Sequence, residues 1–107
     1  MTAAKRRRTN GNEPHAVPHD ERQAVLHRDF RHDLAYWIGS HPRLALRIMR
    51  LIEEIIRDPF SGLGKPEPLR HGLVGRWSRR ITEEDRLEYS VSPQAVHFRR
   101  ARFHYPS

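Results

Sequence analysis

The sequence has no cysteine and no long hydrophobic run, and both absences limit what the chain can do. Without cysteine it has no disulfide framework, no thiolate nucleophile and no cysteine-type zinc site. Its eight histidines are scattered without metal-ligand spacing, so we expect no metal and no other cofactor. Its apolar stretches are far shorter than the roughly twenty residues that span a bilayer. We therefore expect a soluble, cytoplasmic protein that does not enter a membrane.

The sequence also has fewer acidic than basic residues. The chain has 20 Lys and Arg against 13 Asp and Glu, a formal charge of +7 over 107 residues. A chain of this length forms one domain, so the excess positive charge must lie on its surface. This favours a polyanionic partner, nucleic acid or an acidic protein, and a basic protein without such a partner remains the alternative.

The N-terminal residues 1–20 lack aromatic side chains and apolar periodicity. We expect a disordered basic extension there, followed by a single domain over residues 21–107. Its basic run from Lys5 to Arg8 is either an arm that touches RNA or a solvated tail.

Periodicity in the remaining sequence predicts an α+β fold. A short strand is expected at residues 23–26, followed by two amphipathic helices, the first starting from the N-cap Asp29 and the second ending at Asp58. Residues 59–72 are rich in proline and glycine and are expected to form a loop. Beyond them the apolar period becomes two, which predicts an antiparallel meander of three strands that ends near residue 103. The N-terminal strand and the helical hairpin should pack on this antiparallel sheet.

The sheet region is rich in arginine, and helices can cover only one of its faces. Arg86 precedes a strand whose apolar residues alternate inward, and Arg80 is out of phase with Trp77 and Ile81. Both arginines should therefore lie on the open face. Guanidinium groups bind phosphates through paired hydrogen bonds and stay charged at any working pH. The open face is thus expected to bind phosphates, unless its arginines are solvated or paired with acidic neighbours.

RNA cleavage without a metal needs a base for the ribose 2′-hydroxyl, an acid for the leaving oxygen and cations for the charged intermediate. Glu67 offers a carboxylate held between two prolines. His104 follows the last strand, and a histidine has an ordinary pKa of about 6.5. Neither residue alone is a strong signal, because exposed glutamates and terminal histidines are commonly inert.

Two stretches carry a resemblance to a known family: PFSGLGKPEPLRH (Pro59–His71) and GRWSRRITEEDRL (Gly75–Leu87). They resemble the signature of the YoeB (Txe/YoeB) toxins in the RelE/ParE superfamily, and the similarity extends from about Val25 to Tyr105. It implies a fold similar to microbial ribonucleases and a type II toxin that cuts messenger RNA in the ribosomal A site. It also implies a cognate YefM-like antitoxin with an acidic segment.

The resemblance also implies roles for single residues. Glu67 corresponds to the general base, His104 to the general acid and Arg86 to the cation that stabilises the transition state. The expected substrate contacts are Arg70, Arg80, Tyr105, Lys65 and Arg79. Two hypotheses remain for Glu84: it orients Arg86 or Arg80, or it is a turn residue without a role in the site.

Three alternatives to this function remain. The first is a gyrase-inhibiting toxin of the ParE type, the second is a nucleic-acid-binding protein without catalysis, and the third is an inactive toxin. The last alternative arises because Pro106 and Ser107 extend beyond the usual end of the family, at Tyr105. The last strand is also more basic than is usual in the family, and its arginines are expected to contact ribosomal RNA or the antitoxin.

Overall fold

The computed structural model describes residues 21–69 and 75–103. The expected disordered extension, residues 1–20, and the expected site residues Arg70, His104 and Tyr105 lie outside the described residues. The elements in chain order are β2 (Gln23–Leu26), α1 (Arg28–Ser40), α2 (Pro42–Arg57), β3 (Glu67–Pro68), β4 (Arg76–Arg80), β5 (Arg86–Val91) and β6 (Ala95–Arg100). Within the described part of the chain, no helix is long and apolar enough to cross a membrane.

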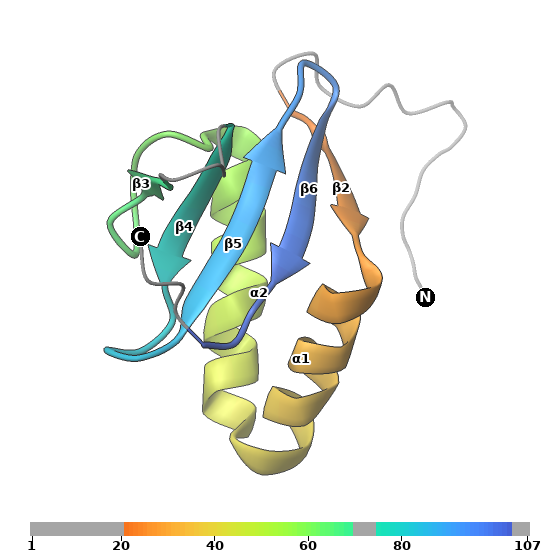
Figure 1. Ribbon diagram of the computed structural model, residues 1–107, viewed down its shortest axis with the longest axis vertical. Helices are drawn as coiled ribbons and strands as arrows, with labels where there is room; N and C mark the ends of the chain where they lie inside the picture. The colour runs from red at the N-terminus through yellow and green to blue at the C-terminus, as the bar shows by residue number, and fades with distance from the viewer. Residues whose placement is uncertain (1–20, 70–74, 104–107) are drawn as a thin grey trace, which may run out of the picture.

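The strands form one sheet in the order β2-β6-β5-β4-β3 (Figure 1). Strands β4, β5 and β6 are consecutive antiparallel neighbours, which confirms the predicted meander. The strand predicted at residues 23–26 is also present, and it pairs with β6 in parallel. The first and the last strand of the described chain therefore lie side by side.

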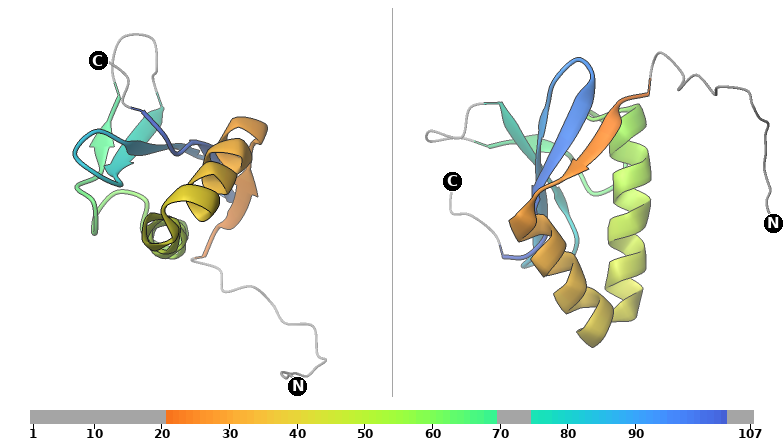
Figure 2. Two further views of the ribbon diagram at one scale, coloured as in Figure 1. Left: turned by 90° about the horizontal axis from the view of Figure 1, so that it is seen from below. Right: turned by 90° about the vertical axis from the view of Figure 1, so that its right-hand side faces the viewer.

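Both helices pack on the same face of this sheet (Figure 2). Helix α1 buries Phe30 and Trp37, and one stripe of α2 buries Ala45, Ile48, Leu51, Ile52 and Ile55. These side chains join sheet residues such as Leu87, Tyr89 and Phe98 in one core. Each fully buried large apolar side chain contributes about 1.5–3 kcal/mol. The predicted α+β architecture is thus confirmed, and the other sheet face is free of helices.

The start of α1 differs from the prediction. Asp29 was expected to be the N-cap, but the helix begins at Arg28 and His27 is the capping residue, without a side-chain hydrogen bond. Asp29 lies instead in the first turn, where its negative charge interacts favourably with the helix dipole. Between the helices only His41 is non-helical, and Pro42 occupies the first turn of α2, where its missing N–H is tolerated.

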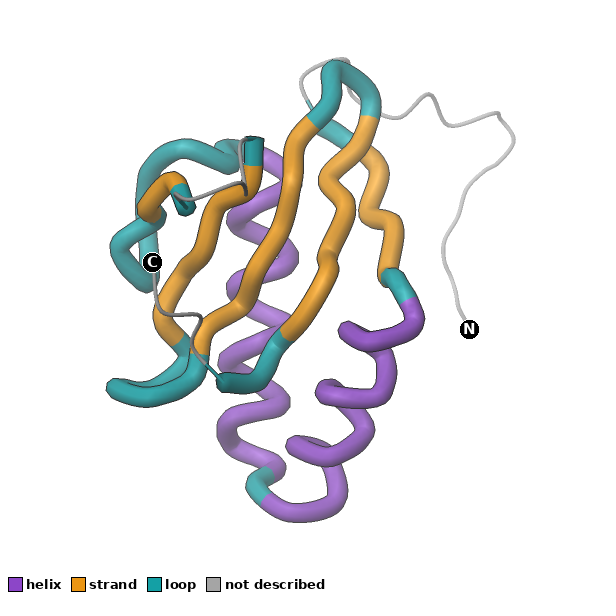
Figure 3. Tube along the Cα trace, in the orientation of Figure 1, coloured by secondary structure: helices purple, strands orange, loops and turns teal. Residues whose placement is uncertain are grey.

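The segment expected to be a plain loop contains a short strand. Glu67 and Pro68 form β3, which pairs with β4 at the edge of the sheet (Figure 3). Gly64 ties the loop before β3 to the sheet, because its carbonyl accepts the Arg80 N–H at 2.8 Å. Gly64 has a φ of +86°, and a Cβ there would lie 3.2 Å from the Arg80 backbone, so glycine is required. Glu67 therefore has a fixed backbone position in the sheet.

Candidate active site on the open sheet face

A row of polar residues crosses the open face of the sheet. Glu67 pairs with Ser78, Ser78 with Glu88, and Glu88 with Arg100 in the strand registers. Opposed residues on neighbouring strands point to the same face. Because Leu87 and Tyr89 point into the core, this row must lie on the face that the helices leave open.

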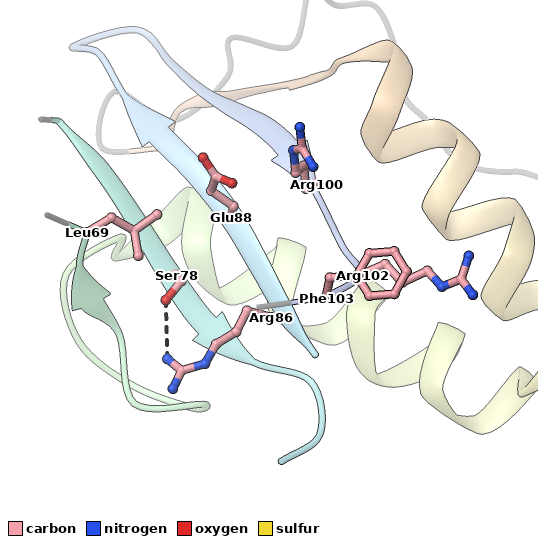
Figure 4. A pocket seen from close by; sticks show the side chains of 7 residues that line it. All are labelled: Leu69, Ser78, Arg86, Glu88, Arg100, Arg102 and Phe103. Carbon is pink, nitrogen blue, oxygen red and sulfur yellow. Dashed lines mark hydrogen bonds between the residues drawn. The ribbon is translucent and has the colours of Figure 1, made fainter. Parts of the chain in front are cut away.

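Glu67 and Arg86 form the centre of this site. Arg86 Nη1 donates to Glu67 Oε1 at 2.9 Å and to Ser78 Oγ at 3.3 Å, as Figure 4 shows. The Glu67 side chain is 53% exposed and that of Arg86 is 12% exposed. Arg86 Nε is buried and has no hydrogen-bond partner within residues 21–69 and 75–103. The site therefore offers an accessible carboxylate and a guanidinium with donors left for an anion.

A cavity of about 50 Å³ adjoins Arg86, lined by Leu69, Ser78, Arg86, Glu88, Arg100, Arg102 and Phe103 (Figure 4). Glu88, only 3% exposed, lies in its wall. Its Oε2 accepts a hydrogen bond from Arg76 Nη1 at 2.6 Å, whereas its Oε1 is buried without a partner. A space of this size holds at least one water molecule or a polar group of a ligand.

Three other expected site residues can be located. Arg80 lies directly opposite Arg86 in the pairing of β4 with β5, so the two side chains share the open face as predicted. Lys65 is exposed just before β3. Among the described residues, the Glu84 carboxylate pairs with neither Arg80 nor Arg86, and only its backbone N–H is held, by Thr82 Oγ1. In this structure Glu84 therefore orients neither arginine.

The expected substrate contact of Arg79 is also wrong. Its side chain is 0% exposed, and its guanidinium donates to the carbonyls of Asp58, Ser61 and Leu63, at 2.6, 2.9 and 3.0 Å. These bonds fix the loop that leads to Glu67. Strand phase could have revealed this, because Arg79 is two residues from Trp77 and so points toward the helices.

The same phase rule identifies two site residues that the sequence analysis missed. Ser78 is two residues from Arg80 on β4, and Glu88 is two residues from Arg86 on β5. Side chains spaced by two share a face of a strand, so both lie on the open face with the arginines. One supports Arg86 and the other forms the cavity wall.

The segment after β6 is fastened to α1. Asp33 Oδ2 accepts the Ala101 N–H at 2.9 Å, and Trp37 Nε1 donates to the Ala101 carbonyl at 2.6 Å. Burial raises the pKa of the Asp33 carboxyl, against the smaller opposing effect of the Ala101 N–H. The Arg102 guanidinium stacks 3.5 Å from the centre of the Tyr36 ring, and Figure 4 shows this side chain extending toward α1. Phe103 follows with 65% of its surface exposed, so it does not belong to the core.

Comparisons with known sequences identify the family to which the chain is similar. Residues 26–105 match the model of the YoeB-like toxin of bacterial type II toxin-antitoxin systems. Toxin RelK of Mycobacterium tuberculosis is 52% identical over 73 residues, which cover 68% of this chain and 86% of the relative. Toxin YoeB of Escherichia coli K12 is 48% identical over 73 residues, covering 68% of this chain and 87% of the relative.

Solved structures agree with this result. A YoeB/ParE toxin from Agrobacterium tumefaciens has a TM-score of 0.74 and 39% identity, covering 78% of this chain and 99% of that chain. The toxin in a YoeB-YefM complex from Staphylococcus aureus has a TM-score of 0.70 and 29% identity, covering 78% of this chain and 98% of that chain. The sequence match, the shared fold and the polar row on the open sheet face lead to one conclusion: the chain belongs to the YoeB-like toxins of bacterial type II toxin-antitoxin systems.

Proposed function

We propose that this chain is a metal-independent endoribonuclease that cuts messenger RNA in the A site of the bacterial ribosome and so stops translation. The observation that carries the proposal is the contact of Glu67 with Arg86 at 2.9 Å on the open sheet face. A carboxylate and a guanidinium at this distance provide the base and the phosphate-binding cation that RNA cleavage needs.

In the proposed reaction, the phosphate of the RNA competes with Glu67 for the Arg86 guanidinium. Arg86 Nε has no partner among the described residues, so a phosphate oxygen would satisfy a donor that is otherwise buried at a cost of about 1–3 kcal/mol. The move of Arg86 toward the phosphate breaks its hydrogen bond with the Glu67 carboxylate, which can then accept a proton from the substrate.

The proposed chemical step uses Glu67, Arg86 and His104. Glu67 takes the proton of the ribose 2′-hydroxyl as the 2′-oxygen attacks phosphorus, and the bond from phosphorus to the 5′-oxygen breaks. His104 gives a proton to that 5′-oxygen. The products are a 2′,3′-cyclic phosphate and a 5′-hydroxyl. Arg86 stabilises the extra negative charge on the phosphorane between these events.

The remaining contacts in this proposal are made by basic and aromatic residues. Arg80 and Lys65 lie near Arg86 and Glu67 in the sheet and the loop before it, where they would hold neighbouring phosphates. Arg70 and Tyr105 are proposed to seat the scissile nucleotide, the tyrosine by stacking on a base. Because ribosomes translate messages in the bacterial cytoplasm, this activity would take place there.

A cognate antitoxin is the second proposed partner. The relative from Staphylococcus aureus is described as a complex of YoeB with YefM, and the present chain carries a charge of +7. An antitoxin with an acidic segment that orders on binding would cover this basic surface. Charge complementarity would also speed the encounter.

The proposal is tested by primer extension on a defined message translated in a purified system. The wild-type chain is compared with Glu67→Gln, His104→Ala and, as a matched control, Glu84→Gln, which changes an exposed glutamate whose carboxylate has no partner among the described residues. Wild type and Glu84→Gln should produce cuts that require ribosomes. Glu67→Gln and His104→Ala should each cut at least about 100-fold more slowly, which is the lower range for loss of a general base or acid.

Other outcomes have distinct meanings. If the wild-type chain leaves the message whole while translation continues, the nuclease proposal fails. Inhibition of gyrase by the same preparation would then favour a ParE-type toxin. If the message is cut equally fast by Glu67→Gln, the base is a different group.

A further inference from the structure

The backbone of Phe103 is held in an unusual conformation. Its φ is +65°, in the left-handed region that residues other than glycine rarely adopt. Such conformations persist where the surrounding structure fixes them, and they cluster at functional sites. Burial of the side chain does not fix Phe103, because 65% of its surface is exposed.

Hydrogen bonds to two consecutive residues hold this backbone instead. The Phe103 N–H donates to Asp85 Oδ1 at 2.8 Å, and the Phe103 carbonyl accepts the Arg86 N–H at 3.1 Å. Asp85 and Arg86 are adjacent at the start of β5. The next residue in the sequence after Phe103 is His104. The Asp85 carboxylate thus holds the N–H of the residue that precedes the proposed general acid. Arg86, which carries the proposed transition-state cation, holds the carbonyl of the same residue.

Asp85 is itself held in a rigid turn. Thr82 Oγ1 donates to Asp85 Oδ2 at 3.1 Å, and it accepts the Asp85 N–H at 2.9 Å. The Asp85 carbonyl accepts the N–H groups of Ile81 and Thr82, at 2.8 and 3.1 Å. The carboxylate therefore has one oxygen fixed by the turn and the other directed at Phe103, which is the arrangement of a support that positions a neighbouring group.

We propose that Asp85 is a positioning residue for the general acid of this toxin. It acts through the Phe103 N–H and fixes the backbone of the residue that precedes His104 in the sequence. The inference rests on the function proposed above and adds to it a residue that does not touch the substrate. Its neighbour Glu84 cannot do this, because its carboxylate is exposed and without a partner among the described residues.

The role predicts a defect confined to protonation of the leaving group. Water has a pKa of about 15.7 and alcohols are similarly weak acids, so an alkoxide needs a proton to leave. A thiol has a pKa of about 8.5, so a thiolate leaves without one. A message in which sulfur replaces the 5′-oxygen at the cut site therefore bypasses the general acid, while binding, the base and the phosphorane remain the same.

The experiment measures single-turnover cleavage of two short messages on purified ribosomes, one with oxygen and one with sulfur at the scissile position. Asp85→Ala should cut the oxygen message about 10- to 100-fold more slowly. This is less than the full rate acceleration of a general acid, about 10²- to 10⁴-fold, because His104 is still present. It should cut the sulfur message within about threefold of wild type, because no acid is needed there. His104→Ala should show the same selective defect, with a larger amplitude.

Two matched variants separate the hydrogen bond from the charge. Asp85→Asn keeps an oxygen for the Phe103 N–H but loses the hydrogen bond that Thr82 Oγ1 donates, so it should restore part of the rate on the oxygen message. Glu84→Ala removes a charge from the same turn and should cut both messages as wild type does. Thermal unfolding of each variant by circular dichroism shows whether it is folded. If Asp85→Ala does not fold, Thr82→Val tests the same support and should give a smaller, equally selective defect.

The contrary results are also distinct. Equal slowing of both messages by folded Asp85→Ala, or no slowing of either, would overturn the positioning role. An oxygen-message defect as large in Asp85→Asn as in Asp85→Ala would also contradict it, since the hydrogen bond would then be irrelevant. If the wild-type chain cuts neither message, the nuclease proposal fails, and the role of Asp85 fails with it.

Discussion

At the scale of single residues, the guanidinium of Arg79 organises the loop that leads to Glu67. It is fully buried on the helix side of the sheet, and its donors satisfy the carbonyls of Asp58, Ser61 and Leu63. It also donates to the Tyr89 hydroxyl at 3.3 Å. A guanidinium can satisfy several acceptors at once because its five N–H donors lie in one plane. Lysine could not replace it there.

This arrangement predicts that adjacent arginines have opposite roles. Arg79→Ala should lower the free energy of unfolding by about 3 kcal/mol or more, because it leaves several buried carbonyls without donors. Arg80→Ala, on the open face, should change it by no more than about 0.5 kcal/mol but should slow RNA cleavage. Urea unfolding followed by tryptophan fluorescence measures the first effect, and primer extension the second. Equal stability of the two variants would contradict the buried role of Arg79.

Only part of the site could be predicted from the position of each residue in its strand. Strand phase predicted Arg86 and Arg80 on the open face, and the structure confirms both positions. The same rule would have placed Arg79 inside, but its charge suggested a substrate contact. Asp85 was not predicted as a site residue, because its partner is Phe103, a residue from another part of the chain.

At the scale of elements, periodicity was sufficient where an element is long enough to repeat. Helices α1 and α2 and the meander β4 to β6 were predicted because each places several apolar residues on one face. Strand β3 was not predicted, since two residues, one of them a proline, are too short to show a period. The parallel pairing of β2 with β6 was not predicted either, because a period says which face is buried and not which strand is the neighbour.

The edge formed by β2 and β6 contains a histidine pair that makes stability depend on pH. His27 Nε2 and His97 Nδ1 share a hydrogen bond of 2.9 Å. Burial, followed by the positive charge of Arg99, lowers the pKa of His27 in the folded chain. The folded state therefore disfavours the charged imidazole, and this contribution to stability is present above the ordinary pKa of about 6.5 and is lost as the pH falls through the lower folded value.

We expect the wild-type chain to lose more thermal stability than His27→Gln between about pH 7.5 and about pH 5. His32→Gln is the matched control, because it removes an exposed histidine from α1 that has no partner among the described residues. Melting temperatures from circular dichroism at the two pH values test this expectation. Parallel pH dependence in wild type and His27→Gln would rule out the contribution of the pair.

At the scale of the whole molecule, arginines lie both on the open face of the sheet and on the helix layer that covers its other face. The helices cover one sheet face (Figures 1 and 2). The other face carries the site, and Arg100 of the last strand lies on it opposite Glu88. Arg99, on β6, contacts Ser90 across this sheet, whereas Arg50 is exposed on α2 in the helix layer. A polyanion that binds the sheet face should depend on the first arginine and not on the second.

This separation is measurable as a salt dependence. The logarithm of the affinity for ribosomes, plotted against the logarithm of the salt concentration, should be less steep for Arg99→Gln by about one unit or less, the effect of one lost phosphate contact. Arg50→Gln should keep the wild-type slope. Sedimentation of the chain with ribosomes at several salt concentrations gives these values. The opposite pattern would indicate that ribosomal RNA meets the helix layer.

The pairing of β2 with β6 also has a consequence for biosynthesis. The sheet of the described chain is complete only when β2 has met β6, and these two strands are its first and its last in the sequence. A domain whose contacts join distant parts of the sequence folds after those parts are available. A nascent chain therefore lacks the finished sheet, with its open face, until β6 has been translated and can pair with β2.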